Sequence, residues 1–431
     1  MWFLLIALFW LARKIVIGKF SPDALRNPFL TIPILILVAL LPISLAVSTN
    51  WFLSLPKVDG VILGALFFFA IVNQIQTRDD LARASIWLVA VCLGIAVAGL
   101  IGTDWAQGKI IGATFLYDHL PRFIQSIPRS IAGGFARNGV GGTLAFTIPF
   151  LAAIGFARGG AVWARQSLAP DSDKNRVGTN QPRFPNTLMM RLPRPYVSFV
   201  IFSFIISLVT LALTQSRGGI LGTLIGLGCV AIFHLAPRKF WRDKKFAGAL
   251  IAGAIFFAVL VTRYGEAGLN FFLRLDAPDG TLASRVEVWQ RGWMMVQDFP
   301  LTGIGIGTYN PIAHLLYPFF IAAPDEIVPH AHNQFLEVAI DLGIPGLIAY
   351  LALMIGFAVC LARAYRATQD ARLRALAIGL GCGMIAHHIF GLTDAFILGS
   401  KPGLVMWIYF GFAAACVNVA ENESQLITEN K

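Results

Sequence analysis

Long runs of apolar residues, separated by short polar segments, dominate this chain. The hydrocarbon core of a bilayer is about 30 Å thick, so a helix needs about 20 mainly apolar residues to cross it. A helix satisfies its own backbone hydrogen bonds in lipid, and no run alternates with the period of two that a barrel strand requires. The runs therefore predict membrane-spanning helices, near 29–48, 58–76, 83–102, 139–157, 196–214, 219–235, 247–262, 336–361, 375–393 and 402–419.

The first segment, MWFLLIALFWLARKIVIG, has a shorter apolar stretch and allows three interpretations. It is a cleaved signal, a short span or an interfacial helix, and the lack of a small-residue cleavage site favours a short span. The predicted fold class is thus an all-α polytopic membrane protein with about 10–12 transmembrane helices. Composition agrees, because 57% of the residues are hydrophobic and only 13% are charged, against about 25% charged in soluble globular proteins.

The basic residues predict which way the helices are oriented. About two thirds of the 34 Lys and Arg residues lie in alternate connecting segments. The excess of Lys and Arg in cytoplasmic loops places these segments in the cytoplasm. The net charge of +11 is then mainly a topology signal, so nucleic-acid binding is not needed to explain it. The predicted cytoplasmic segments are 13–28, 77–83, 158–195, 236–246, 362–374 and the C-terminal tail.

Two long connections divide the chain into parts. A polar loop rich in Pro and Asn, at about 158–195, is predicted to be a disordered cytoplasmic loop within an N-terminal transmembrane bundle, 1–262. Residues 263–335 are predicted to form a periplasmic loop with an amphipathic helix in TLASRVEVWQRGWMMVQDFP, for which Ser284 is the expected N-cap. The C-terminal transmembrane helices and a cytoplasmic tail follow at 336–431.

Titratable residues gather where the outer loop returns to the membrane, in PDEIVPHAHNQFLEVAIDLGIPG. His330 and His332 point to one side only if this segment is extended. A helix that starts near Ala331 would place His332 in its first turn, and a neutral histidine suits a general base. Asn333 and Glu337, one turn apart, are candidates for orienting neighbours or a substrate. The DLGIPG sequence is expected to break this helix before the true span begins.

A metal site at these histidines would need further ligands. Asp325 and Glu326 lie nearby, but no third ligand stands at a recognisable spacing, so neither a metal nor another cofactor is predicted. The five cysteines lie in apolar runs without CxxC spacing, which favours neither a zinc site nor disulfides. Asp394, near the outer end of a later span, is a weak candidate for the site.

Arginines at the outer ends of spans form a second group of candidates. Arg217, in TQSRGG, lies between two predicted spans and runs against the positive-inside bias. Arg285 lies on the amphipathic helix, one turn before Trp289, and Arg137 and Asn138 lie at another outer span entrance. Two interpretations are possible for each of these residues. It lies in a turn or on a solvated helix face, or it binds a substrate, because guanidinium groups suit phosphate and pyrophosphate.

The glycine-rich stretch LTGIGIGTYN is not a dinucleotide-binding motif, since no strand–turn–helix unit surrounds it. Gly303, Gly305 and Gly307 either let backbone N–H groups approach a phosphate or form a turn that returns the loop to the membrane. The sequence leaves both interpretations open.

Arginines and a histidine base beside lipid together fit glycan transfer from a lipid pyrophosphate to a hydroxyl. The ordered motifs TQSRGG, SRVEVWQRGW, FPLTGIGIGTYN and HAHNQFLEVAIDLGIPGLIAYL, with the basic inside loop, resemble the O-antigen ligase and polymerase superfamily. The resemblance covers roughly residues 135–400. Members of that superfamily are multi-pass glycosyltransferases of the C-type membrane class in the bacterial inner membrane.

The resemblance implies an undecaprenyl-pyrophosphate-linked glycan as donor, a site facing the periplasm, no metal, and inversion at the anomeric carbon. In the ligases the acceptor is lipid A-core, and membrane lipids surround the protein. By their place in the motifs, Arg217 and Arg285 would bind the pyrophosphate and His332 would be the base. His330, Asn333 and Glu337 would support them.

Two alternatives stay open. The same chemistry with another acceptor, a growing glycan or a protein hydroxyl, would make the chain a polymerase or a protein glycosyltransferase. A lipid or ion transporter would use the arginines as substrate clamps. Transporters often contain inverted repeats with broken helices, and no internal repeat is visible in this sequence.

Overall fold

A computed structural model describes residues 27–103, 105, 134–167, 194–235, 282–320 and 327–429. Within these ranges, nine helices are long and apolar enough to cross a membrane. The predicted all-α polytopic membrane fold is therefore confirmed. The predicted span 247–262 and the N-terminal segment lie outside the described residues. The nine helices are α2 (Pro28–Val47), α3 (Trp51–Gln74), α4 (Arg78–Gly102), α8 (Arg137–Ser167), α9 (Arg194–Thr214), α10 (Arg217–Leu235), α14 (Gln334–Ala367), α15 (Ala371–Phe390) and α16 (Leu404–Glu429).

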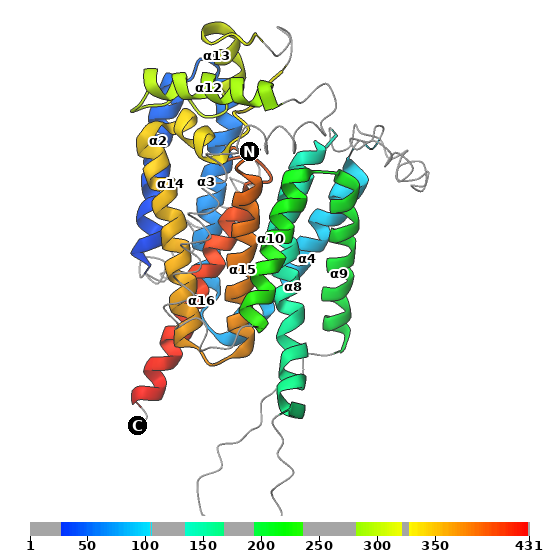
Figure 1. Ribbon diagram of the computed structural model, residues 1–431. Coiled ribbons are helices and arrows are strands. Elements are labelled where there is room, and N and C mark those ends of the chain that lie inside the picture. The colour runs from blue at the N-terminus through cyan, green and yellow to red at the C-terminus, as the bar shows by residue number, and fades with distance from the viewer. Residues whose placement is uncertain are drawn as a thin grey trace, which may run out of the picture.

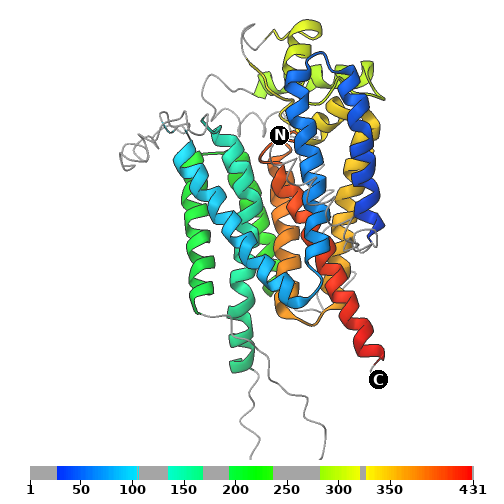
Figure 2. The same cartoon turned by 180° about the vertical axis from the view of Figure 1, so that it is seen from behind.

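The spanning helices form an upright bundle in which helices distant in sequence pack together (Figure 1). Helix α15 packs against α8 and α10, and α14 packs against α2 and α16. From behind, α4 slants away from α3 toward α9, which it contacts (Figure 2). The first and last thirds of the chain thus share one core, and the site elements described below meet at one end of it.

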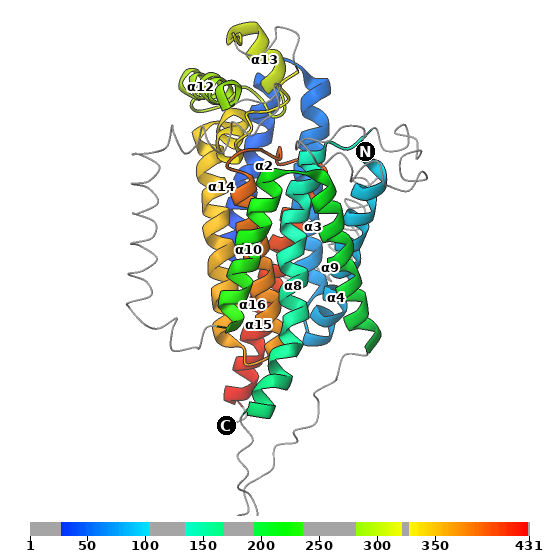
Figure 3. The same cartoon turned by 45° about the vertical axis from the view of Figure 1, so that its right-hand side comes forward.

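Two shorter helices lie at that end of the bundle. They are α12 (Leu282–Asp298), at the position of the predicted amphipathic helix, and α13 (Tyr309–Leu316). Helix α12 lies across the ends of the spans, and Figure 3 views it nearly along its axis. A separate apolar cluster joins both helices to the start of α14 through Val288, Met295, Tyr309, Ile312 and Ile340. This cluster holds α12 over the first turns of α14.

The helix starts differ from the sequence predictions. Helix α14 begins at Gln334, and its N-cap Asn333 accepts the N–H groups of Phe335 and Leu336. The prediction of a helix from Ala331 is therefore wrong, and His332 precedes the helix. The prediction of Ser284 as an N-cap is also wrong, because α12 already begins at Leu282.

The predicted cytoplasmic loop at 158–195 is shorter at both ends than the sequence indicates. Helix α8 continues to Ser167, and α9 begins at Arg194. Apolar residues at 161–163 carry the helical pattern beyond the predicted end of the span. The segment 168–193 lies outside the described residues, so its predicted disorder stays a prediction.

The expected break in DLGIPG occurs at Gly343, where φ is 69° and ψ is −176°. That backbone region is essentially restricted to glycine, and a Cβ there would lie 2.7 Å from the carbonyl carbon of Leu301. The turn after α12 fills the break, because Ile344 donates its N–H to the Pro300 carbonyl at 2.7 Å. The half-helix before Gly343 is joined to the histidine segment at its start.

Candidate active site

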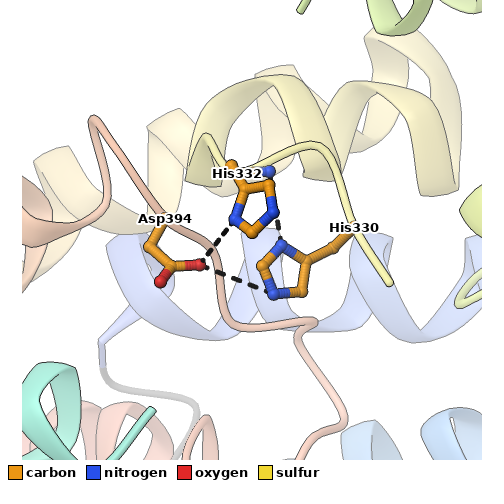
Figure 4. Close-up of side chains that lie close together, drawn as sticks. All are labelled: His330, His332 and Asp394. Carbon is orange, nitrogen blue, oxygen red and sulfur yellow. Dashed lines mark hydrogen bonds and ion pairs between the residues drawn. The ribbon is translucent and has the colours of Figure 1, made fainter. Parts of the chain in front are cut away.

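Two loops meet at the end of the bundle under α12. The segment 327–333 leads into α14 and carries His330 and His332, and the turn after α15 carries Asp394. Both imidazoles point toward the carboxylate of Asp394 (Figure 4). The Oδ1 atom of Asp394 lies 3.2 Å from Nδ1 of His332 and 3.5 Å from Nε2 of His330. The histidines therefore share one side, as expected for an extended segment.

The backbone at His332 is held in an unusual conformation. Its φ is +50°, in the left-handed region that non-glycine residues rarely occupy. The His332 carbonyl accepts the indole N–H of Trp289 at 3.3 Å, and its N–H faces Nδ1 of His330 at 3.3 Å. Strained backbone of this kind costs on the order of 1–3 kcal/mol and persists only where surrounding contacts determine it, commonly at functional sites. Helix α12 supplies one of these contacts.

His330 is a neutral residue inside the cluster. Burial lowers the pKa of His330 to about 4, and the positive charges of Arg285 and Lys57 act in the same direction against the opposing carboxylate of Asp394. The imidazole is therefore uncharged at neutral pH. Because Nδ1 faces a backbone N–H, the ring proton is assigned to Nε2, on the side of Asp394.

Asp394 stays ionised although its side chain is only 8% exposed. Burial raises its pKa, but the hydrogen bond from His332, the two histidines and the Ala395 N–H together lower it below its usual value. A carboxylate at 3.2 Å from Nδ1 holds the His332 proton on that nitrogen. The Nε2 atom of His332 is then left with a free lone pair, which is what a general base requires.

A pair of side chains at the start of α14 fastens the Asp394 turn. Gln334 donates to the Phe396 carbonyl at 3.0 Å and accepts the Phe396 N–H at 2.8 Å, while its own N–H donates to the Gly391 carbonyl at 2.7 Å. Asn333 donates to the Leu392 carbonyl at 3.2 Å. These bonds fix the turn on both sides of Asp394, so the carboxylate and His332 are held as one unit.

Glu337 forms a hydrogen bond to the backbone of the histidine segment. Its side chain is fully buried, and Oε2 accepts the N–H of Ala331, the residue between the two histidines, at 2.7 Å. This contact orients the segment itself. The role in substrate binding that the motif suggests stays a prediction.

Two of the arginines predicted to bind substrate begin helices that meet at the same end of the bundle, whereas Arg285 lies within α12. Arg217 is the first residue of α10, and Arg137 and Asn138 open α8. A Cβ at Gly219 would lie 2.8 Å from the Gly141 backbone, so the two helix ends are in close contact. A Cβ at Gly218 would lie 2.9 Å from Oγ1 of Thr393, the neighbour of Asp394. The helix start that carries Arg217 therefore packs against the turn that carries Asp394.

The structure adds a cation that the sequence analysis did not single out. Lys57, near the start of α3, packs with its Cγ 3.1 Å from the position of a Cβ at Gly307. Its charge acts on His330, as does that of Arg285 on α12. A single lysine in a short outer segment forms no sequence motif that would mark it as a site residue. Its place against the glycine-rich turn results from the packing of α3.

The glycine-rich stretch is a turn rather than a phosphate cradle. Its N–H groups are already used: that of Ile306 donates to Oγ of Ser44 at 2.8 Å, and that of Gly307 donates to Oδ1 of Asp341 at 2.9 Å. The positive φ angles of Gly303, Gly305 and Gly307 allow this tight path. The phosphate interpretation is therefore wrong, because a carboxylate holds the N–H that it would need.

Asp394 is a possible third metal ligand, which the local spacing of residues around the histidines does not reveal. Among the described residues, His330, His332 and Asp394 form a group whose ligand atoms all lie within 4.8 Å of one another. His332 and Asp394 are 62 positions apart in the sequence, so no short motif contains both. The five cysteines are free and contribute no ligand.

Comparison with known proteins identifies the region that contains most of these residues. Residues 202–351 match the sequence model of the O-antigen ligase family. The chain is 24% identical over 235 residues to an uncharacterized protein of Haemophilus influenzae. The aligned residues make up 51% of this chain and 57% of that protein. The chain is 30% identical over 144 residues to the exopolysaccharide production protein ExoQ of Rhizobium meliloti, 31% of this chain and 32% of that protein.

The chain thus aligns with about half of one relative and about a third of the other. The matched stretch contains Arg217, Arg285 and both histidines, whereas Asp394 lies beyond it. The resemblance of this chain to the O-antigen ligase superfamily is therefore confirmed over residues 202–351.

Proposed function

We propose that this protein is a metal-independent, inverting glycosyltransferase that moves a glycan from undecaprenyl pyrophosphate to a hydroxyl acceptor. The observation that carries the proposal is the contact of His332 with Asp394, beside helices α8 and α10 that both begin with an arginine. The family match makes glycan transfer the reaction to consider. The site would face the periplasm of a bacterium with the protein in its inner membrane, as the distribution of Lys and Arg supports.

In the proposed reaction the acceptor oxygen attacks the anomeric carbon of the donor. A new carbon–oxygen bond forms while the bond to the pyrophosphate oxygen breaks and leaves with its electron pair. Nε2 of His332 takes the hydroxyl proton, and the carboxylate of Asp394 stabilises the resulting imidazolium. Arg217 and Arg285 bind the departing pyrophosphate, and Arg137 and Asn138 contribute to the same site. Two helix N-termini at this position add favourable partial charge for an anion.

The acceptor that the family description favours is lipid A-core, the substrate of an O-antigen ligase. The second candidate is a growing glycan, which the similarity to the exopolysaccharide production protein ExoQ supports. A protein hydroxyl is a third acceptor with the same donor. A transporter would need no base beside the arginines, so the paired His332 and Asp394 favour the enzyme.

Purified protein incubated with undecaprenyl-pyrophosphate glycan and separate acceptors tests the proposal. We expect release of undecaprenyl pyrophosphate together with glycan attached to lipid A-core. Growth of the glycan without lipid A-core would identify a polymerase instead. Failure to release the lipid pyrophosphate with lipid A-core, glycan and peptide acceptors would argue against transfer and for transport.

Asp394→Asn is expected to lower the transfer rate by about 10²-fold or more, since general-base catalysis contributes roughly 10²–10⁴. The amide keeps the shape of the side chain but removes the charge that holds the His332 proton on Nδ1. Asp298→Asn, on exposed α12 surface where Asp298 binds Tyr317, is the matched control and should leave the rate unchanged. Equal rates in both variants would remove Asp394 from the mechanism.

A further inference from the structure

The two imidazoles and the carboxylate that form the proposed base are also spaced as ligands of a small divalent ion. Zinc binds imidazole nitrogen at about 2.0–2.1 Å and carboxylate oxygen at about 2.0–2.2 Å, so neighbouring ligand atoms of a tetrahedral site lie about 3.3–3.5 Å apart. Asp394 Oδ1 lies 3.2 Å from Nδ1 of His332 and 3.5 Å from Nε2 of His330. Two of the three distances between the ligand atoms therefore already match those of a tetrahedral zinc site.

We propose that His330, His332 and Asp394 bind a divalent transition-metal ion, with Zn²⁺ as the best fit, and that the bound ion blocks glycan transfer. Binding itself is independent of the reaction, whereas the inhibition rests on the proposed function. Two imidazoles and one carboxylate select Zn²⁺, Co²⁺ or similar ions over Mg²⁺ and Ca²⁺, which prefer oxygen ligands.

The surroundings of the three side chains suit an ion that exchanges with solvent. Asp394 is fixed by the N–H of Ala395 at 2.9 Å, an outer contact of the kind that orients metal ligands. The His330 and His332 side chains are 18% and 25% exposed, so an ion can reach them and keep a fourth position open. The carboxylate supplies the negative charge that offsets part of the charge of the ion.

Metal binding and base catalysis exclude each other at His332. In the metal-free site the His332 proton stays on Nδ1, against Asp394, and Nε2 is free to accept a proton. When the ion takes Nδ1, that proton moves to Nε2, and the imidazole can no longer act as a base. At His330 the proton moves from Nε2 to Nδ1, which ends the 3.3 Å contact with the His332 N–H. The proton count of the site does not change.

Cobalt titration of the purified full-length chain in detergent tests the binding, after removal of any histidine tag. We expect the visible absorption of four-coordinate Co²⁺, which Zn²⁺ abolishes by displacement. His330→Ala and Asp394→Ala should each weaken cobalt binding at least about tenfold, because loss of outer-shell partners alone costs 10- to 100-fold. His314→Ala, on α13, changes a histidine outside the cluster and should bind as the wild type does. Asp394→Asn serves as a second variant if either alanine variant melts early.

Equal cobalt binding by the wild type and the cluster variants would overturn the site, as would binding without the four-coordinate spectrum. In the activity arm, Zn²⁺ should inhibit wild-type transfer, and chelation should restore it. If a chelator abolishes glycan transfer and added zinc restores it, the ion is required for the reaction and its inhibitory role is overturned. Cobalt binding with no transfer to any acceptor would leave the metal site standing and remove the proposed function.

Discussion

His332→Ala is expected to lower the transfer rate by about 10²–10⁴-fold, the range that general acid–base catalysis contributes. The substitution removes the nitrogen that would take the hydroxyl proton, while Asp394 and the arginines keep their places. Donor binding should therefore change little. The measurement is the rate of glycan transfer at saturating donor, together with the dissociation constant of the lipid-linked donor for each variant.

The matched control for this prediction is His314→Ala. His314 lies in the last turn of α13 and is absent from the histidine–aspartate cluster. Its variant should transfer glycan at the wild-type rate. If His332→Ala instead loses donor binding and keeps its rate per bound donor, His332 is a binding residue and another group removes the proton.

Arg217→Ala and Arg285→Ala are each expected to reduce the transfer rate by about 10²–10³-fold, comparable to the loss of one charge-stabilising donor in other enzymes. The guanidinium groups would stabilise the negative charge that develops on the departing pyrophosphate. Lysine at either position should restore only part of the rate, because an ammonium group cannot form the paired hydrogen bonds of a guanidinium. Rates and donor affinity are measured for each alanine and lysine variant.

Arg366→Ala provides the control for the loss of one arginine. Arg366 is exposed in the last turn of α14, at the opposite end of the bundle from α12 (Figure 1). Its removal should leave transfer unchanged, and all variants should insert into the membrane to the same extent. Full activity of the Arg217 or Arg285 variant would contradict a pyrophosphate-binding role for that residue.

The sequence determined most of the fold within the described residues. Apolar runs gave nine spans, because lipid imposes a minimum length and a composition that a single chain reveals directly. Gly343 broke α14 where DLGIPG indicated, since its backbone conformation belongs to glycine. The helix starts at Gln334 and Leu282 were less predictable, because capping depends on which side chain finally reaches the free N–H groups.

The sequence also identified the family and the histidine–arginine motifs, because these are contiguous and ordered along the chain. It could not show which residues meet. Asp394 reaches His332 across 62 residues because Gln334 and Asn333 fasten the turn after α15 to the start of α14. Lys57 reaches the glycine-rich turn only through the packing of α3, and Ser44 and Asp341 on other helices accept the N–H groups of that turn.

Local patterns therefore determined the spans, the kink and the candidate residue types, since each depends on the chemistry of neighbouring positions. The tertiary structure alone decided that two histidines and a distant aspartate bring their nitrogen and oxygen atoms within 4.8 Å of one another. Such a cluster depends on how two connections between helices pack against each other, and no spacing in the sequence records that distance.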